Sequence, residues 1–357
     1  MGQAQKIGVL TFHRCINYGS YWQARCLVTG LRARGYDAVL LDYTCREATR
    51  AEWRCALQPL LPERSPPCDA RSYADKTRKF LAAIDEIPRE QAFELGDPAS
   101  MPDYDLVLVG SDEVWNFNHP WYGGRPIFFG NGLRARRLAS YGASFGSYSS
   151  SAGLNDYWSA LLRRFTALSV RDENSRSLIR NALARDPALV LDPCLQFPLQ
   201  VPTNGARPQK PYVALYGHSF PTWFVDRLCS WASRTDHRIV SIGYRNPCAD
   251  EQCIAASPED FASLLSHAAA VATNFFHGCI FALLNARPFA CVRSPYRLNK
   301  VRDLTVLLGA SHHLVDERTS AATFSHLLSH APDDAISAKI ESIRTTSNSY
   351  LDRILCA

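Results

Sequence analysis

A strand, a helix and a second strand follow one another near the start of the chain, and this alternation most constrains its fold. The apolar run from Lys6 to Phe12 predicts a buried strand. Residues 21–34 predict a helix that Gly35 ends, and residues 37–43 predict a second buried strand. Such a unit is expected to hold its two strands in parallel, joined by a right-handed crossover.

The alternation continues on both sides of a proline-rich segment, 197–210, which predicts a linker. The further predicted strands read as short apolar runs, and they lie at 103–113, 136–146, 167–171, 188–193, 212–218, 237–244, 269–275 and 288–292. A length of 357 residues suits two domains rather than one. We therefore predict an α/β protein with two Rossmann-like domains facing a cleft.

The predicted domain boundaries follow from these segments. The N-terminal domain is placed at 1–196, the linker at 197–210 and the C-terminal domain at 211–330. An insertion at about 44–100 is polar and carries clustered prolines, so it predicts irregular or helical structure. A final helix at 331–357 could pack back on the N-terminal domain.

Composition and charge argue against several classes of protein. No apolar run is long enough to span a bilayer, and the chain does not start with a charged leader and an apolar segment. The expectation is a cytoplasmic protein, at most peripheral at the inner face of a membrane. A net charge of +5 without a basic stripe gives no support for nucleic acid. Twelve cysteines without a Cys-x-x-Cys motif predict no metal site, and no tightly bound cofactor is expected.

Polar residues stand at four places where a predicted strand runs into the next element. Ligands of parallel sheets bind at such carboxyl ends, so these residues are candidates for a functional site. At the first junction, Asn17, Tyr18, Gly19 and Ser20 precede a helix. The backbone amides of Gly19 and Ser20 could bind an anion there, or the segment could be an ordinary helix cap.

The second and third junctions carry charged side chains. Asp112 follows Ser111 at the end of a strand and could orient or deprotonate a sugar hydroxyl, although either residue could simply cap the next turn. Arg171 ends a strand directly before Asp172. An arginine at that position could clamp an anion, or it could be a surface residue beside a capping aspartate.

The fourth junction contains His277 and Gly278 at the predicted start of a helix. Histidine is suited to proton transfer near neutral pH, although a single histidine is often structural. Glycine at position 278 would allow a ligand to approach the backbone. Downstream, Arg293, Arg297 and Lys300 form either a cationic wall of the cleft or part of a solvated helix face.

Aromatic side chains gather after the second junction. Trp115 and Asn116 are candidates for acceptor binding, and Trp115, His119, Trp121 and Tyr122 could stack on a sugar. Packing is the alternative for the same rings.

Together these segments resemble the polysaccharide pyruvyl transferase family. The matching stretches keep their order over about Lys6 to Leu308 and read "GVLTFHRCINYGSYWQARCL", "YDLVLVGSDEVWN", "ASYGASFG", "SVRDENS", "LDPCL" and "TNFFHGCIFALLNARPF". The resemblance implies a fold like that of glycosyltransferases of the B type. It also implies transfer of pyruvate from phosphoenolpyruvate onto two hydroxyls of one sugar, forming a cyclic ketal, in bacterial exopolysaccharide or cell-surface glycan synthesis.

The resemblance also suggests roles for residues. A subgroup of the family reads Thr-Asp-Ser-Phe-His-Gly at the fourth junction, which residues 273–278 resemble with two changes. Other members read Arg-Leu-His there, and their arginine and histidine contact phosphoenolpyruvate; Phe275 stands in the place of that arginine. His277 is implied as the acid/base group and Arg171 as a donor contact.

The remaining site residues are assigned by position. Asp112 joins His277 as catalytic, Gly278, Arg293, Arg297 and Lys300 join Arg171 as donor-binding, and Asn17, Tyr18, Gly19, Trp115 and Asn116 are acceptor-binding. The expected co-substrates are phosphoenolpyruvate and a lipid-linked, nucleotide-linked or polymeric sugar. Two alternatives stay open, a glycosyltransferase with a nucleotide-sugar donor and a non-catalytic glycan-binding relative.

Overall fold

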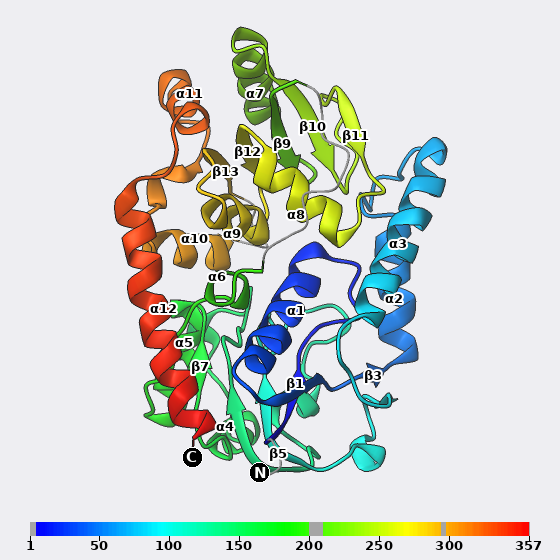
Figure 1. Cartoon of the computed structure of the whole chain (residues 1–357), viewed down its shortest axis with the longest axis vertical. Coiled ribbons are helices and arrows are strands. Elements are labelled where there is room, and N and C mark those ends of the chain that lie inside the picture. Colours follow the sequence, from blue (N-terminus) through cyan, green and yellow to red (C-terminus); the bar gives the residue numbers. More distant parts are fainter. Residues whose placement is uncertain (1–4, 200–209, 294–297, 357) are drawn as a thin grey trace. The chain divides into compact units, whose positions relative to one another are not determined.

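The computed structural model describes residues 5–199, 210–293 and 298–356 and divides into two compact units. Unit 1 comprises Met1–Glu52, Ile84–Pro198 and Ile340–Ala357, and unit 2 comprises Trp53–Ala83 and Leu199–Lys339. The segment from Trp53 to Ala83 thus groups with the C-terminal half of the chain. Most of the predicted linker lies outside the described residues. Figure 1 traces the elements of both units.

Unit 1 contains, among its described residues, a parallel sheet of four strands in the order β2-β1-β5-β6. The strands are β1 (Lys6–Leu10), β2 (Asp37–Leu40), β5 (Tyr104–Val109) and β6 (Ala135–Ser140). Single parallel bridges connect the β6 side of the sheet to β7 (Ser169–Val170), which pairs with β8 (Ala188–Leu189). A further short pair joins β3 (Tyr43–Thr44) to β4 (Phe93–Glu94). All these pairs are parallel, as the predicted alternation of strands and helices requires.

Helices accompany the unit 1 sheet. They are α1 (Tyr18–Ala33), α4 (Asp156–Arg163), α5 (Glu173–Leu183), α6 (Pro193–Gln196) and most of α12 (Asp334–Leu355). Helix α12 is tied to unit 1 by Tyr350, whose hydroxyl donates to the carbonyl of Ser140 at 2.7 Å. Helices α2 (Arg46–Leu57) and α3 (Ala70–Asp85) cross from one unit to the other. Short 3₁₀ turns lie at η1 (Pro67–Asp69), η2 (Pro98–Ser100), η3 (Pro126–Phe129), η4 (Ser150–Ala152) and η6 (Ser311–His313).

Unit 2 is built around a parallel sheet that shows six strands in the described part, in the order β11-β10-β9-β12-β13-β14. The strands are β9 (Tyr212–Tyr216), β10 (Arg238–Ile242), β11 (Glu251–Cys253), β12 (Ala270–Thr273), β13 (Phe289–Val292) and β14 (Leu314–Val315). Its other helices are α7 (Thr222–Arg234), α8 (Pro258–His267), α9 (Phe276–Leu284), α10 (Leu298–Leu307) and α11 (Ala321–Ser329). The central strands are apolar throughout because both faces of a parallel sheet are covered.

The core of each unit reflects its sequence. The unit 1 core is rich in aromatic rings, with Trp115, Phe128, Phe129 and Phe145 fully buried. The unit 2 core packs smaller side chains of β9, β12 and β13 against α7 and α11. No helix in the described ranges has both the length and the apolar composition needed to cross a bilayer. The predicted α/β class with parallel sheets is confirmed.

Candidate functional site

The first junction of unit 1 forms a helix cap. Asn17 precedes α1, and its side-chain oxygen accepts hydrogen bonds from the backbone amides of Gly19 at 2.8 Å and Ser20 at 3.2 Å. The sequence analysis suggested that these two amides bind an anion. In the structure, both already donate to the side chain of Asn17. Tyr18 is fully buried. This junction is therefore a helix cap, and Asn17 is the capping residue.

The second junction centres on the carboxylate of Asp112. Its Oδ2 atom accepts a hydrogen bond from the Ser20 hydroxyl at 2.7 Å, and Oδ1 accepts from Arg171 at 3.0 Å. Asp112 has a φ of 65°, a left-handed conformation that few residues other than glycine adopt. The side chain is 5% exposed. Partners on α1 and at the end of β7 thus hold the carboxylate at the carboxyl edge of the sheet.

Arg171 lies between two carboxylates at the third junction. Its guanidinium contacts Asp112 at 3.0 Å and Asp192 at 2.7 Å, and all three side chains are buried. Burial alone would lower the pKa of Arg171, but the nearby carboxylates, led by Asp112 and Asp192, raise it. The charge of Arg171 is thus balanced inside unit 1. Asp192 was not among the predicted site residues, although it lies in the quoted "LDPCL" stretch.

The aromatic candidates that follow the second junction differ in how deeply they are buried. The Trp115 ring is fully buried, and its indole nitrogen donates to the carbonyl of Phe128 at 2.7 Å. Asn116 is 1% exposed and donates to Glu113 at 2.7 Å. Both side chains are buried among protein partners, and their role as acceptor contacts stays a prediction. Trp121 is half-buried, and its indole nitrogen donates to Glu52 at 2.9 Å.

In unit 2, His277 is the second residue of α9, directly after the carboxyl end of β12. The side chain is 8% exposed, and its ring packs against that of Phe276 with centroids 5.1 Å apart. The predicted strand-to-helix position is therefore correct. This position places a histidine at the edge where ligands of parallel sheets bind.

Packing against Thr273 leaves no room for a side chain at Gly278. A Cβ atom at this position would lie 2.2 Å from Oγ1 and 2.7 Å from Cβ of Thr273. Thr273 cannot easily give way, because its hydroxyl donates to the carbonyl of Tyr216 at 2.6 Å and accepts from the amide of Phe275 at 3.0 Å. Close packing of α9 on β12 thus accounts for Gly278 without a ligand.

Two asparagines hold the loop that follows β9. Asn246 donates to the carbonyl of Gly217 at 3.0 Å, and Asn274 donates to the carbonyl of His218 at 2.8 Å. Gly217 has a φ of 143°, and a Cβ atom there would lie 2.1 Å from Oδ1 of Asn274. That oxygen is buried and accepts no hydrogen bond from any described residue. Asn246 carries no sequence motif that would have identified it.

Phe275 belongs to an aromatic cluster, which we define as Tyr216, His218, Tyr244 and Phe275. The Phe275 centroid lies 4.9 Å from that of Tyr216, 5.3 Å from Tyr244 and 5.5 Å from His218. The rings meet nearly edge to face, the favourable arrangement for aromatic pairs. Phe275 is thus integrated into the fold of unit 2.

The predicted cations after β13 have different surroundings. Arg293 is exposed at the end of β13, and Lys300 is 8% exposed on α10. Arg297 lies outside the described residues. The described structure therefore gives no common location for the three.

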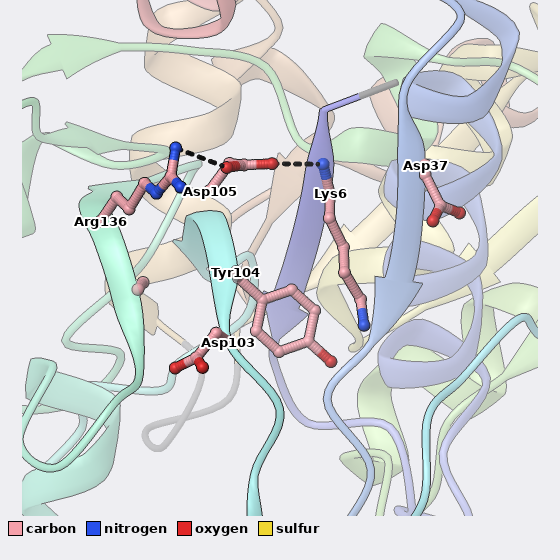
Figure 2. A pocket seen from close by; sticks show the side chains of 7 residues that line it. Lys6, Asp37, Asp103, Tyr104, Asp105 and Arg136 are labelled. Atoms are coloured by element: carbon pink, nitrogen blue, oxygen red, sulfur yellow. Dashed lines mark hydrogen bonds and ion pairs between the residues drawn. The ribbon is translucent and has the colours of Figure 1, made fainter. Parts of the chain in front are cut away.

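An open pocket of about 950 Å³ lies at the opposite, amino-terminal edge of the unit 1 sheet. Figure 2 shows Lys6, Tyr104 and Asp105 on neighbouring strands, with the Lys6 amide and the Arg136 side chain both directed to the Asp105 carboxylate. The Lys6 amine pairs with Glu90 at 2.7 Å. Charges in this pocket largely pair with one another, and it lies away from the polar junctions. We therefore place the candidate site at the carboxyl edges.

Two α/β units, each with a parallel sheet, give the chain a fold of two Rossmann-like domains like that of B-type glycosyltransferases. A structure of Staphylococcus aureus MnaA with UDP is 13% identical, with a TM-score of 0.52, and the match covers 96% of this chain and 97% of that one. It shows the fold alone. The calicheamicin glycosyltransferase CalG4 (15% identity, 99% and 100% coverage) and the Methanocaldococcus jannaschii UDP-GlcNAc 2-epimerase (13%, 96% and 100%) have TM-scores of 0.44 and 0.43.

The chain belongs to the polysaccharide pyruvyl transferase family, whose model matches residues 17–295. This span contains all four polar junctions and confirms the family predicted from the sequence. The subgroup suggested by residues 273–278 stays a prediction. Among curated proteins, no match was found.

Proposed function

We propose that this protein transfers pyruvate from phosphoenolpyruvate onto two hydroxyls of a sugar, forming a cyclic ketal in the synthesis of a bacterial surface polysaccharide. Family membership over residues 17–295 is the observation that carries the proposal. The placement of His277 at the carboxyl edge of the unit 2 sheet supports it, because this chemistry needs an acid/base group.

The proposed reaction has a defined atom balance. A proton is added to the methylene carbon of phosphoenolpyruvate, which becomes the methyl group of the ketal. One sugar hydroxyl forms a C–O bond to the neighbouring carbon, and the C–O bond to phosphate breaks. A second hydroxyl forms the other C–O bond and closes the ring. The two hydroxyl protons balance the one gained by carbon and the one that leaves with inorganic phosphate.

Two groups would move or orient protons in this scheme. His277 would deliver the proton to the methylene carbon, the step that creates positive charge at the ketal carbon. Asp112 would orient an acceptor hydroxyl, with Ser20 hydrogen-bonded to the same carboxylate at 2.7 Å. Arg171 would act through Asp112 as a positioning residue, because its guanidinium already bonds that carboxylate and Asp192.

The direct test is incubation of the full chain with phosphoenolpyruvate and a panel of lipid-linked and nucleotide-linked sugars. Mass spectrometry should find a sugar that has gained a pyruvyl ketal, with one inorganic phosphate released for each product. Hydrolysis of a nucleotide sugar, without use of phosphoenolpyruvate, would instead identify a glycosyltransferase. Binding of a pyruvylated glycan without turnover would identify a non-catalytic relative.

Replacement of His277 by Ala should lower kcat about 10²- to 10⁴-fold, the usual contribution of general acid–base catalysis. His267→Ala is the matched control in the same unit, because His267 ends α8 and bonds the carbonyl of Ser263 at 2.8 Å. Steady-state kinetics and circular dichroism of both variants check the prediction. Near-normal turnover in a folded His277→Ala variant would contradict the assigned role.

A further inference from the structure

A second open pocket of unit 1 lies beside the amino-terminal ends of β7 and β8 and has a volume of about 480 Å³. Pockets of this size are typical of sites for small molecules. Arg171 follows β7 at the other end of that strand, so the pocket is separate from the polar junctions of the candidate site. The polar side chains in its lining are Thr166, Arg176, Arg185, Asp186, Thr346 and Arg353.

The end of α5 brings Arg185 to this pocket. Helix α5 is capped by Ala184, whose φ of 52° is left-handed and breaks the helix. The guanidinium of Arg185 then donates to the carbonyls of Phe165 at 3.0 Å and Thr166 at 3.3 Å, just before β7. Two neutral carbonyls therefore hold the cation in place. Arginine has five N–H groups, so these bonds leave further donors for a ligand.

Asp186 supplies a carboxylate to the lining, but neighbouring arginines balance its charge. Its oxygens accept hydrogen bonds from Arg176 at 2.9 and 2.7 Å, and Arg180 donates to it at 2.9 Å. Arg176 also lies 3.5 Å from the carboxylate of Glu173. Two guanidiniums and two carboxylates thus form a network whose formal charge is zero.

The charges of Arg185 and Arg353 are not balanced in this way. The guanidinium of Arg353, an exposed residue of α12, lies 5.5 Å from the centroid of the Tyr350 ring, which is neutral. In the part of the chain that the structure describes, neither Arg185 nor Arg353 forms an ion pair with a carboxylate. The two guanidiniums therefore give the pocket a surplus of positive charge.

A phosphate group matches this surplus. As a monoester it carries close to two negative charges at neutral pH, whereas a carboxylate carries one. The planar fork of a guanidinium also fits the oxygens of phosphate through paired hydrogen bonds. We propose that this pocket binds a phosphate monoester group, with Arg185 and Arg353 as its anion contacts.

The phosphate group can arrive on a free small molecule or on a lipid headgroup, because both present the same oxygens to the two guanidiniums. The inference does not depend on the proposed function, since the pocket lies away from His277 and Asp112 in the fold of unit 1 and at the opposite ends of the strands.

The test compares the full chain with Arg185→Gln, Arg353→Gln, the double variant and the control Arg163→Gln. Arg163 ends α4, is exposed, and donates to the carbonyl of Ala182 at 3.3 Å without lining the pocket. Isothermal titration calorimetry near neutral pH measures binding of glycerol 3-phosphate, with glycerol as the uncharged comparison. Co-sedimentation uses vesicles of phosphatidylcholine alone and of phosphatidylcholine with an equimolar amount of phosphatidic acid. Circular dichroism checks the fold of each variant.

We expect glycerol 3-phosphate, but not glycerol, to bind the wild type. Each single variant should bind about tenfold more weakly, because it loses a charge-assisted contact, and the double variant should show no measurable binding. Arg163→Gln should behave as the wild type. If the wild type also sediments with the phosphatidic acid vesicles, and the double variant does not, the pocket accepts a lipid headgroup. Binding of glycerol 3-phosphate without sedimentation would restrict it to free phosphate esters.

Three results would overturn the proposal. The first is wild-type affinity for glycerol 3-phosphate in folded Arg185→Gln and Arg353→Gln variants. The second is an equal loss in Arg163→Gln, which would mean that the overall charge of the protein and not the pocket attracts the anion. The third is a wild type that binds neither glycerol 3-phosphate nor the phosphatidic acid vesicles.

Discussion

Unit 1 and unit 2 build the carboxyl edges of their sheets in different ways. In unit 1, Arg171 is held between the buried carboxylates of Asp112 and Asp192. In unit 2, side-chain amides hold the loop after β9, and aromatic rings surround the start of α9. The first edge contains a buried ionic network, and the second contains side-chain amides, aromatic rings and the buried amine of Lys76.

This difference concerns how each edge accommodates buried charge. The Arg171 guanidinium contacts two carboxylates, Asp112 and Asp192, and these carboxylates raise its pKa against the effect of burial. In unit 2, the amine of Lys76 donates to the carbonyl of Gly243, and burial lowers its pKa to about 7. Three measurements can break or sharpen this comparison.

The largest effect is expected when Arg171 is replaced by Met. The change leaves two buried carboxylates without their cation, and breaking such a pair costs about 3–5 kcal/mol of unfolding free energy. Arg176→Met on α5 is the control, because Arg176 pairs with a half-exposed aspartate, Asp186, and should cost about 0–1 kcal/mol. Urea denaturation measures both. Equal costs for the two variants would show that Arg171 does not organise the unit 1 edge.

Lys76 should make the stability of the protein depend on pH. Its pKa is about 7 in the folded protein and about 10.4 in the unfolded chain, so between these values the unfolded chain binds more protons. The free energy of unfolding should then rise with pH from about 7 to 10, by up to about 1.4 kcal/mol per unit from this group.

Urea denaturation at pH 7, 8 and 9 checks this contribution as the difference between the wild type and Lys76→Met. The variant should lack the rise, and it should be the more stable protein below pH 7, where the wild type carries a buried charge. If the free energies of unfolding of the two proteins change with pH in parallel, the Lys76 amine keeps its normal pKa. The edge of unit 2 would then not contain a lysine whose pKa is lowered by burial.

Much of the fold could be predicted because its signals are local. A parallel strand covered on both faces reads as an apolar run, and the polar residues after it mark the carboxyl edge. The positions of His277 and Asp112 after the carboxyl ends of strands were predicted in this way, and their roles stay predictions. The same reasoning predicted a helix cap as one alternative at the first junction, where Asn17 is the capping residue.

The partners of these residues could not be predicted, because they depend on contacts between distant parts of the chain. Asp192 reaches Arg171 from 21 positions away, and Asn274 holds a carbonyl 56 positions away. Lys76 lies in a segment predicted as an insertion of the N-terminal domain, whereas residues 53–83 group with unit 2. For Trp115 the sequence left sugar stacking and packing open, and the structure shows the ring fully buried in the core.

The smallest effect is expected for Gly278→Ala. A Cβ atom 2.2 Å from the Thr273 hydroxyl forces α9 to shift, which overpacking data put at about 1–3 kcal/mol of unfolding free energy. Gly96→Ala is the control, since nothing lies within 4 Å of a Cβ atom there. In a Thr273→Ala background the cost should shrink, because the clashing hydroxyl is gone, and a double-mutant cycle by urea denaturation measures that coupling. An unchanged cost in both backgrounds, together with weaker phosphoenolpyruvate binding, would mean that Gly278 serves a ligand rather than the packing of α9 on β12.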